Sequence, residues 1–524
     1  MDTPTVNFNV INQTTAVSRP VEGVSFFLGT SIRGPFNKPS EILSSWASFV
    51  RIYGGLQGGN PAFNLKRYFD KGGKARFARL GHYTDISDAS TLVPIKAQPD
   101  TQIATAGEEE EPFLLSIKNP GTDGNNIVVE ILEPTNGQIG FFDLNIKHET
   151  DTFLSEMFPN ISIPSGSTIE NSNYLKKVIE SSNLVNVEYK TITEEGIITP
   201  LGNIVPITTS VEVSYTGGTD AAITDTDIIG DSSSRTGFYA FDEVEDSYQI
   251  MVLTDNVSAA VHTAGHAYAA NRQDLQYWAA PNPKLVKTKA ELIAFREATG
   301  MTTKFGAIFG GGLTVLNPVN SQIVETPGLA DIAALAVNSE VAFGPWFSFS
   351  GNTRGLITNA LGVTNNFGTT GSKGDLNELA NRQVNMIINR DQQIKLWGGF
   401  STQIKSDSES FISIVKLVMF IKKALRPTLE NFLEEPTDIP TFFRMYHVVK
   451  PFFEELVNRR AIVSWDWRGD QFSSSPADFQ INKAIDVALG KYKVQLVIVP
   501  IVGMQEITIS MYLTADGELL FDGN

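Results

Sequence analysis

Two histidines of this sequence have a spacing that could bind a metal ion. His262 and His266 lie four residues apart in a segment predicted to be helical, so both imidazoles would share one helix face. The segment HTAGH lacks the glutamate of the metalloprotease motif HExxH, and no further ligand follows at a useful offset. We therefore interpret the pair as structural or solvated histidines and predict no metal site.

Two glycine-rich segments invite comparison with phosphate-binding loops. In Gly368–Gly374 the spacing is wrong for such a loop, and Lys373 is followed by glycine instead of serine or threonine. Gly310-Gly311-Gly312 lacks the GxGxxG order of dinucleotide-binding turns. Arg468-Gly469-Asp470 spells an adhesion tripeptide, which we interpret as a chance match. With five histidines and no cysteine, the usual nucleophiles and bases are scarce. The sequence predicts no catalytic residues, no cofactor and no enzyme activity.

Basic side chains gather on one stripe of a helix predicted to begin near Phe411. At 100° per residue they fall within ~120° of one another. They are Lys416, Lys422, Lys423 and Arg426. One interpretation is an ordinary solvated helix face. The other is a basic surface that faces an acidic partner, because charge complementarity sets register and orientation.

Length and composition indicate a multidomain globular protein. The chain has 524 residues, enough for about three domains at ~100–200 residues each. The absence of cysteine fits folding in a reducing cytoplasm. The start MDTPTVNFNV lacks the basic and apolar regions of a signal peptide. The apolar run at 494–504 contains Pro500 and Gly503 and is too short to span a bilayer, so no stable membrane insertion is expected.

The net charge of −17 is concentrated in one internal block. Residues 85–246 contain 28 acidic and 7 basic side chains, while the flanking segments together are near neutral. An acidic, solvated block opposes binding to nucleic acid or to an anionic membrane. We interpret this block as an outward-facing insertion and expect no direct nucleic-acid binding.

The elements around these residues indicate an α/β (α+β) chain. Residues 20–80 predict strand, two helices and strand, with Ser44 or Ser45 as a helix cap and Asn60-Pro61 as a second helix start. Strands dominate the acidic block. Alternating strands and helices over 247–340 indicate a small layer of parallel strands. In the last part, Pro427 is expected to break or kink the long helix and Pro451 to disturb the next one.

Both ends of the chain read as strands without an obvious partner. Apolar residues alternate with polar ones at both ends, which predicts one apolar and one wet face. The alternating residues are Val6, Phe8 and Val10 near the start, and Ile507, Ile509, Met511 and Leu513 near the end. A lone strand must join a sheet to pair its backbone groups. That sheet lies either within a compact monomer or in another subunit, and strand donation between subunits would produce a polymer.

Several ordered motifs resemble those of contractile tail sheath proteins of bacteriophages, a family also found in tailocins and related injection particles. The first motifs are Gly23-Val24, Arg33-Gly34-Pro35, the stretch 45–55 and the stretch 69–79. Further matches are NPGTDGNNIVVEI, YTGGTD, TGFYAFDEVED, VNMIINRDQQIKLWGG and FISIVKLVMFIKKAL. The chain departs from the family at Val415-Lys416, where two adjacent arginines are frequent, and at Gly503-Met504, where a second proline is frequent.

The resemblance implies a discontinuous multidomain fold. The expected parts are an N-terminal arm (1–20), a core (21–84 with 375–503), an acidic β-rich insertion (85–246), a small α/β insertion (247–374) and a C-terminal arm (504–524). The terminal strands would pair with neighbouring subunits in a helical homopolymer around a tail tube. The basic stripe would be a candidate contact with that tube.

The family further implies a mechanical function in the virion tail. The sheath would assemble in the cytoplasm of the bacterial host, meet baseplate and tail terminator proteins, and contract to drive the tube through a bacterial envelope. A tailocin or extracellular injection particle is the alternative source. Two other classes remain, a nucleotide-binding enzyme built on the 247–340 alternation and a monomeric adhesin with an exposed β domain.

Overall fold

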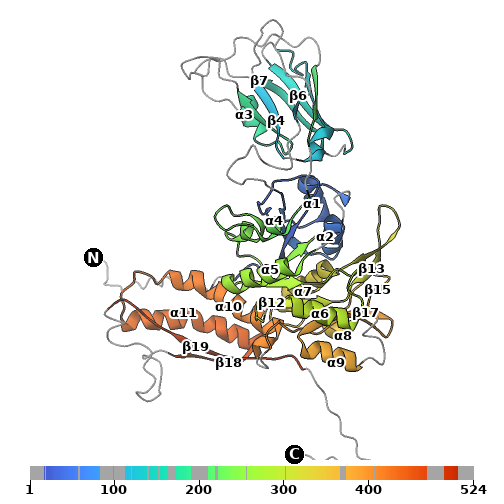
Figure 1. Ribbon diagram of the computed structural model, residues 1–524. Helices are drawn as coiled ribbons and strands as arrows, with labels where there is room; N and C mark the ends of the chain where they lie inside the picture. The colour runs from blue at the N-terminus through green and yellow to red at the C-terminus, as the bar shows by residue number, and fades with distance from the viewer. Residues whose placement is uncertain are drawn as a thin grey trace, which may run out of the picture. The chain divides into compact units, whose positions relative to one another are not determined.

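In the computed structural model the chain divides into two compact units, described in turn (Figure 1). The larger unit comprises Val21–Gly344 and Phe349–Lys405, and the smaller comprises Met1–Pro20, Pro345–Ser348 and Ser406–Asn524. The structure describes residues 17–504 apart from 18, 57–59, 83–97, 100–112, 120, 139–140, 152–153, 163–172, 190–210, 219–221, 255–256, 301, 366–372, 405–407 and 469–488.

A seven-stranded sheet is the centre of the larger unit. Its order is β17-β16-β12-β11-β10-β1-β2, and all neighbours are parallel except β16 and β17. The strands are β1 (Val24–Gly29), β2 (Lys74–Arg79), β10 (Gln249–Leu253), β11 (Gln276–Ala279), β12 (Gly306–Gly310), β16 (Val384–Arg390) and β17 (Gln393–Trp397). The chain moves from β1 to β2 on one side and later continues from β10 on the other. The carboxyl ends of β1 and β10 therefore form a topological switch point.

The largely apolar sequence of β1, VSFFLG, fits its burial. All six residues are buried, as expected for a parallel strand covered by helices on both faces. The helices of this layer are α1 (Trp46–Tyr53), α2 (Asn60–Asp70), α5 (Ala259–Arg272), α6 (Lys289–Ala298), α7 (Leu329–Phe343) and α9 (Lys373–Asn381). Ser45 caps α1 in a capping box with Ser48, which confirms the predicted start, and Gly54 ends the helix.

The sheet divides the chain differently from the expected domain boundaries. Strands from 21–84, from 247–374 and from 375–405 hydrogen-bond in one sheet, so the 247–374 segment is not a separate insertion. Residues after 405 belong to the smaller unit, whereas the expected core joined 375–503 with 21–84. Period and propensity identify strands, but they do not say which strands pair.

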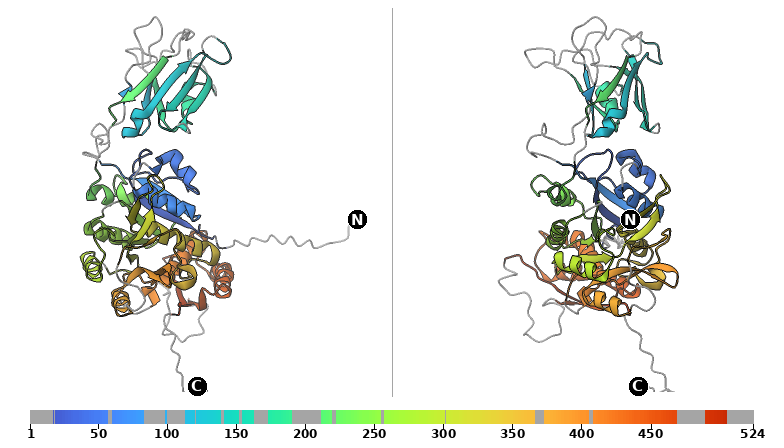
Figure 2. Two further views of the ribbon diagram at one scale, coloured as in Figure 1. Left: turned by 90° about the vertical axis from the view of Figure 1, so that its right-hand side faces the viewer. Right: turned by 45° about the vertical axis from the view of Figure 1, so that its right-hand side comes forward.

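The acidic block contains a β-rich domain with its own core (Figure 2). Its five-stranded sheet has the order β3-β9-β5-β6-β7, and β4 pairs with β8. The elements are β3 (Gln98–Pro99), β4 (Phe113–Ile117), η3 (Thr122–Asn126), β5 (Ile127–Leu132), β6 (Phe141–His148), β7 (Glu156–Ser162), α3 (Leu175–Ile179), β8 (Val185–Tyr189) and β9 (Val211–Thr216). This domain lies in sequence between β2 and β10, two strands of the α/β layer.

The β-rich domain ends earlier than residue 246. After β9, α4 (Asp225–Ile229) contacts α5, and η5 (Gly237–Phe241) places Phe241 in a stack on Phe26 of β1 with ring centroids 4.6 Å apart. Residues 222–246 therefore pack with the α/β layer. A second small sheet, formed by β13 (Leu313–Leu316), β14 (Ile323–Thr326) and β15 (Gly362–Val363), and α8 (Gly351–Arg354) complete the described elements of this unit.

Two long helices and a hairpin form the described part of the smaller unit, together with η6 (Ser408–Ser410). Helix α10 (Ile412–Glu430) packs against α11 (Ile439–Asn458) through Phe420 and Phe452, whose stacked rings are 6.0 Å apart. Of the two outcomes expected at Pro427, a break or a kink, the break is wrong: α10 runs on to Glu430, and the proline, one turn from the end, removes a single helical hydrogen bond. Helix α11 likewise continues through Pro451. No described helix is both long and apolar enough to cross a membrane.

Candidate functional site

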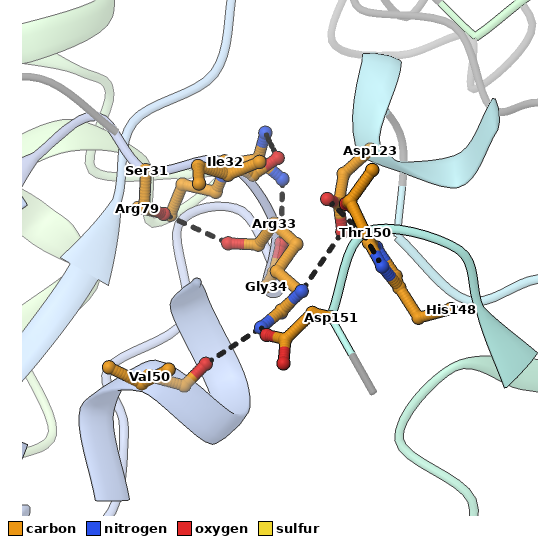
Figure 3. A network of polar contacts seen from close by, with 10 residues as sticks. All are labelled: Ser31, Ile32, Arg33, Gly34, Val50, Arg79, Asp123, His148, Thr150 and Asp151. Atoms are coloured by element: carbon orange, nitrogen blue, oxygen red, sulfur yellow. Dashed lines mark hydrogen bonds and ion pairs between the residues drawn. The ribbon is translucent and has the colours of Figure 1, made fainter. Parts of the chain in front are cut away.

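An arginine at the switch point of the sheet contacts two acidic side chains of the β-rich domain (Figure 3). Arg33 Nη1 lies 3.4 Å from Asp123 Oδ2, and Arg33 Nη2 lies 3.3 Å from Asp151 Oδ2. The same Nη2 donates to the Val50 carbonyl oxygen at the end of α1, at 2.9 Å. Arg33 is 6 % exposed, so this contact is largely shielded from water. We call Arg33, Asp123 and Asp151 the Arg33 clasp.

The loop after β1 holds Arg33 in place. Arg79, at the end of β2, donates to the carbonyl oxygens of Ile32 and Gly34 at 3.1 and 3.0 Å. Ser31 Oγ donates to the Arg33 carbonyl oxygen at 2.9 Å. Gly34 has φ of +101°, and a Cβ there would lie 2.4 Å from the Tyr53 ring, so only glycine fits this turn. These contacts hold the backbone on both sides of Arg33 independently of the contacts that its side chain makes with Asp123 and Asp151.

The acidic side of the clasp is also held by neighbours. His148 Nε2 lies 3.1 Å from Asp123 Oδ1, and Thr150 Oγ1 lies 3.3 Å from His148 Nδ1. Burial acts to raise the pKa of Asp123, but the hydrogen bond from His148 and the charge of Arg33 outweigh it and hold this pKa below its usual range. Asp123 therefore stays ionised and paired with Arg33.

A hydroxyl, an imidazole and a carboxylate in a row resemble a nucleophile relay. Here Asp123 is already paired with the Arg33 guanidinium, and His148 is 3 % exposed. The arrangement suits a fixed contact between two domains better than proton transfer to a substrate. The sequence identified Arg33 and Asp123 only as parts of two separate motifs, Arg33-Gly34-Pro35 and NPGTDGNNIVVEI, because their separation of 90 residues leaves no local pattern.

The smaller unit contains a sheet of only two described strands. β18 (Ile462–Arg468) pairs antiparallel with β19 (Gln495–Pro500), and no third described strand joins them. Trp465 stacks on Phe453 of α11 at 4.9 Å, which seats one face of the hairpin on the helix. Val463 is 60 % exposed and Val499 is 46 % exposed. Among the described residues, the hairpin thus combines two edges that pair with no further strand and exposed apolar side chains.

Only part of the predicted basic stripe on α10 is exposed to solvent. Lys422 and Arg426 are exposed and Lys423 is half-buried, whereas Lys416 is 1 % exposed and cannot face a partner in this conformation. The physical reason is position, since Lys416 lies at the edge of the stripe nearest the apolar face of α10. Arg426 also lies 3.3 Å from Glu430 one turn on.

The predicted strand residues at the chain ends, Val6, Phe8, Val10, Ile507, Ile509, Met511 and Leu513, lie outside the described residues. Close to the first of them, Arg19 forms an ion pair with Glu455 of α11. The end of the N-terminal segment is therefore tied to the same helix that supports the hairpin.

His262 and His266 are core residues of the larger unit. His262 Nδ1 lies 2.8 Å from the Tyr277 hydroxyl, and both imidazoles are almost fully buried. Burial lowers the pKa of His262 to about 4 and that of His266 to about 3, the latter with smaller contributions from His262 and Arg296. Among described residues, no three histidine or acidic side chains form a metal-binding group.

The remaining glycine-rich and adhesion-like motifs either have structural roles or lie partly outside the described residues. Gly310 ends β12, and Gly311 adopts φ of +84°, a conformation that suits glycine in a turn. Most of Gly368–Gly374 lies outside the described residues, and Lys373 begins α9. Arg468 ends β18 and pairs with Asp466 at 2.7 Å, while Gly469 and Asp470 are outside the described residues.

Comparison with known proteins gives a consistent answer at the level of fold. No family model and no curated protein matches the sequence. Among solved structures, the sheath tail protein Lin1278 from Listeria innocua is 12 % identical, with a TM-score of 0.56 over 92 % of this chain and 96 % of that one. The sheath tail protein DSY3957 from Desulfitobacterium hafniense is 12 % identical, with a TM-score of 0.54 over 95 % and 100 %.

A third structure is an assembled particle. The helical sheath of the anti-feeding prophage in its contracted state is 11 % identical, with a TM-score of 0.55 over 98 % of this chain and all of that one. These likenesses extend through both compact units and include the β-rich domain, since nearly the whole chain is covered. The chain therefore has the fold of contractile tail sheath proteins.

Proposed function

We propose that this chain is the structural subunit of a contractile tail sheath. It polymerises helically around a tail tube and contracts to drive the tube through a bacterial envelope. The observation that carries the proposal is the end-to-end likeness to sheath tail proteins, including one in a contracted helical assembly. The motifs of the sequence that resemble this family support it independently.

The β18–β19 hairpin is the acceptor for strands of neighbouring subunits. A two-stranded sheet is marginally stable by itself in water, and each open edge presents unpaired backbone N–H and C=O groups. The chain supplies two alternating segments, one at each end, that need a sheet. Adding one segment to each edge of a neighbour's hairpin would complete a four-stranded sheet from more than one chain.

Such a contact produces an open polymer. The donor segment and the acceptor hairpin are different surfaces, so the interface is heterologous and repeats without closing if the rotation does not return to its start. Contraction is then a rigid-body rearrangement of subunits around strand links that persist. The tail tube, the baseplate and a tail terminator are the expected partners, and the tail of the particle is the expected location.

Electron microscopy of the purified chain tests this proposal. Hollow striated tubes formed by the chain alone, or around added tube protein, are the expected result. Dispersed monomers at high concentration, with and without cognate tube protein, would contradict it.

A particle without a genome is the second candidate. The match to the anti-feeding prophage sheath is as extensive as those to the two sheath tail proteins. Capsid and terminase genes beside the coding sequence would indicate a phage, and their absence beside an intact tail cluster would indicate a tailocin or an extracellular injection system.

A further inference from the structure

The β-rich domain is a folded body with little described contact to the α/β layer. Its described strands make their main contacts with one another, with η3 and with α3. Its apolar core contains residues from both of its sheets, among them Leu115, Ile146 and Val213, which are all buried. A domain with its own core keeps its structure when its neighbour moves.

The Arg33 clasp joins this body to the end of β1. Its two N···O distances, 3.4 and 3.3 Å, are longer than the 2.7–2.9 Å typical of tight charge-assisted hydrogen bonds. Arg33 Nε is buried and has no hydrogen-bond partner among the described residues. The guanidinium therefore holds the acids mainly by charge, and it does so with part of its donor capacity unused.

The attraction between Arg33 and the two aspartates is strong, but neither side needs it to stay folded. The side chains of Arg33 and Asp123 are 7 % and 10 % exposed, which strengthens their attraction, whereas that of Asp151 is 26 % exposed. Both halves are held by their own neighbours, Arg33 by the β1 loop and Asp123 by His148. Breaking the clasp therefore leaves both folded halves intact.

We infer that the Arg33 clasp is a latch that fixes the orientation of the β-rich domain on the α/β layer, and that its release lets the domain move as a rigid body. The latch uses the switch point at which open α/β sheets bind ligands, with two carboxylates of the same chain in the place of an anion. The inference does not rest on the proposed function. In a sheath, the latch would determine whether the β-rich domain moves together with the α/β layer of the same chain when the subunits rearrange.

Spin labels measure this orientation directly, because the chain has no cysteine of its own. Cysteines replace Asp70 on α2 and Lys147 on β6, which are each 47 % exposed, and carry the labels for pulsed electron spin resonance. The variant Arg33→Gln removes the charge of the latch. The control Arg51→Gln removes the same charge from an exposed site on α1. We expect a narrow distance distribution in the parent and the control and a broad one in Arg33→Gln.

Hydrogen exchange distinguishes release from unfolding. In Arg33→Gln, exchange is expected to rise roughly tenfold in residues 30–34 and 122–126, while β1 and β6 stay protected. Asp151→Asn, a milder change on the opposite side, should give the same pattern more weakly, and the double variant should not exceed Arg33→Gln alone. An unchanged distance distribution in Arg33→Gln, or a loss of protection throughout both parts, would overturn the inference. If Arg33→Gln does not fold, Asp151→Asn decides by the same two measurements.

Discussion

The seven-stranded sheet and the β18–β19 hairpin meet the same physical requirement in opposite ways. Every residue of β1 is buried and the strand has a partner on each side, β10 and β2. β18 has one described partner, and four of its seven residues are exposed. Backbone groups of strands must be paired, so β1 is complete among the described strands, whereas we propose that strands of other subunits complete the pairing of the hairpin. The α/β layer of the larger unit can serve as a rigid body, and we propose that the hairpin couples neighbouring subunits.

Removal of a terminal segment is expected to have the largest effect, on polymerisation. A chain without residues 1–20, or without residues 504–524, should remain folded but lose polymerisation completely, because the hairpin no longer receives a strand. Electron microscopy and circular dichroism of each truncation check both parts of the prediction. Normal tubes from either truncated chain would show that the hairpin does not need that terminal segment for assembly.

The buried charge at the α2–α7 contact tests the completeness of the larger unit. Asp331 is fully buried between Arg67, at 2.8 and 3.1 Å, and Lys71. Asp331→Asn leaves these cations uncompensated and should lower the free energy of unfolding by about 3–5 kcal/mol in urea titrations. The control Asp70→Asn removes an exposed partner of Lys66 and should cost less than about 1 kcal/mol. Equal effects would mean that the charges of this unit are not buried as described.

Acid should weaken the larger unit through His266. Burial, with the charges of His262 and Arg296, lowers its pKa from 6.5 to about 3, so the unfolded chain binds the proton more readily. The stability contributed by the neutral imidazole is full above pH 6.5 and falls as the pH drops towards 3, by about 3 kcal/mol at pH 4. Urea unfolding at pH 7 and pH 4 should show a loss about 3 kcal/mol smaller in His266→Phe than in the parent, and the loss that remains includes the share of His262, whose pKa burial lowers to about 4. An identical loss in both would exclude His266 as the cause.

Charge reversal on α10 should give the smallest effect. Lys422→Glu with Arg426→Glu is expected to weaken binding to the tail tube roughly tenfold at low salt and to leave tube-free polymers unchanged. Co-sedimentation with purified tube protein measures the change. Lys176→Glu with Lys177→Glu, on α3, makes the same change in charge outside the stripe. If both pairs weaken binding equally, the stripe is an ordinary solvated face.

Local sequence signals identified the elements of the larger unit well and their assembly poorly. The alternation of Val24, Phe26 and Leu28 before Gly29 predicted β1, and Ser45 predicted the start of α1, because both depend on neighbouring residues. The union of strands from 21–84, 247–374 and 375–405 in one sheet was missed, since pairing over such separations leaves no periodic trace.

The candidate sites show the same limit. Helical spacing placed Lys416 on the basic stripe, but the structure buries it, because spacing gives a direction around the helix axis and not the depth of the neighbouring elements. The Arg33 clasp joins residues 90 and 118 positions apart, so no motif could reveal it. The apolar run at 494–504 contains β19, whereas β18, with its two tryptophans, was not predicted.

Cysteine cross-linking tests whether the terminal segments add to the hairpin of another subunit. Ser510→Cys is combined in turn with a cysteine at Val463, Ser464, Val499 or Gln495, exposed positions along β18 and β19, in a chain that otherwise lacks cysteine. We expect at least one pair, oxidised under polymerising conditions, to give a ladder of dimers, trimers and higher oligomers on a non-reducing gel. Tubes that form normally while none of the pairs gives more than the monomer band would contradict it.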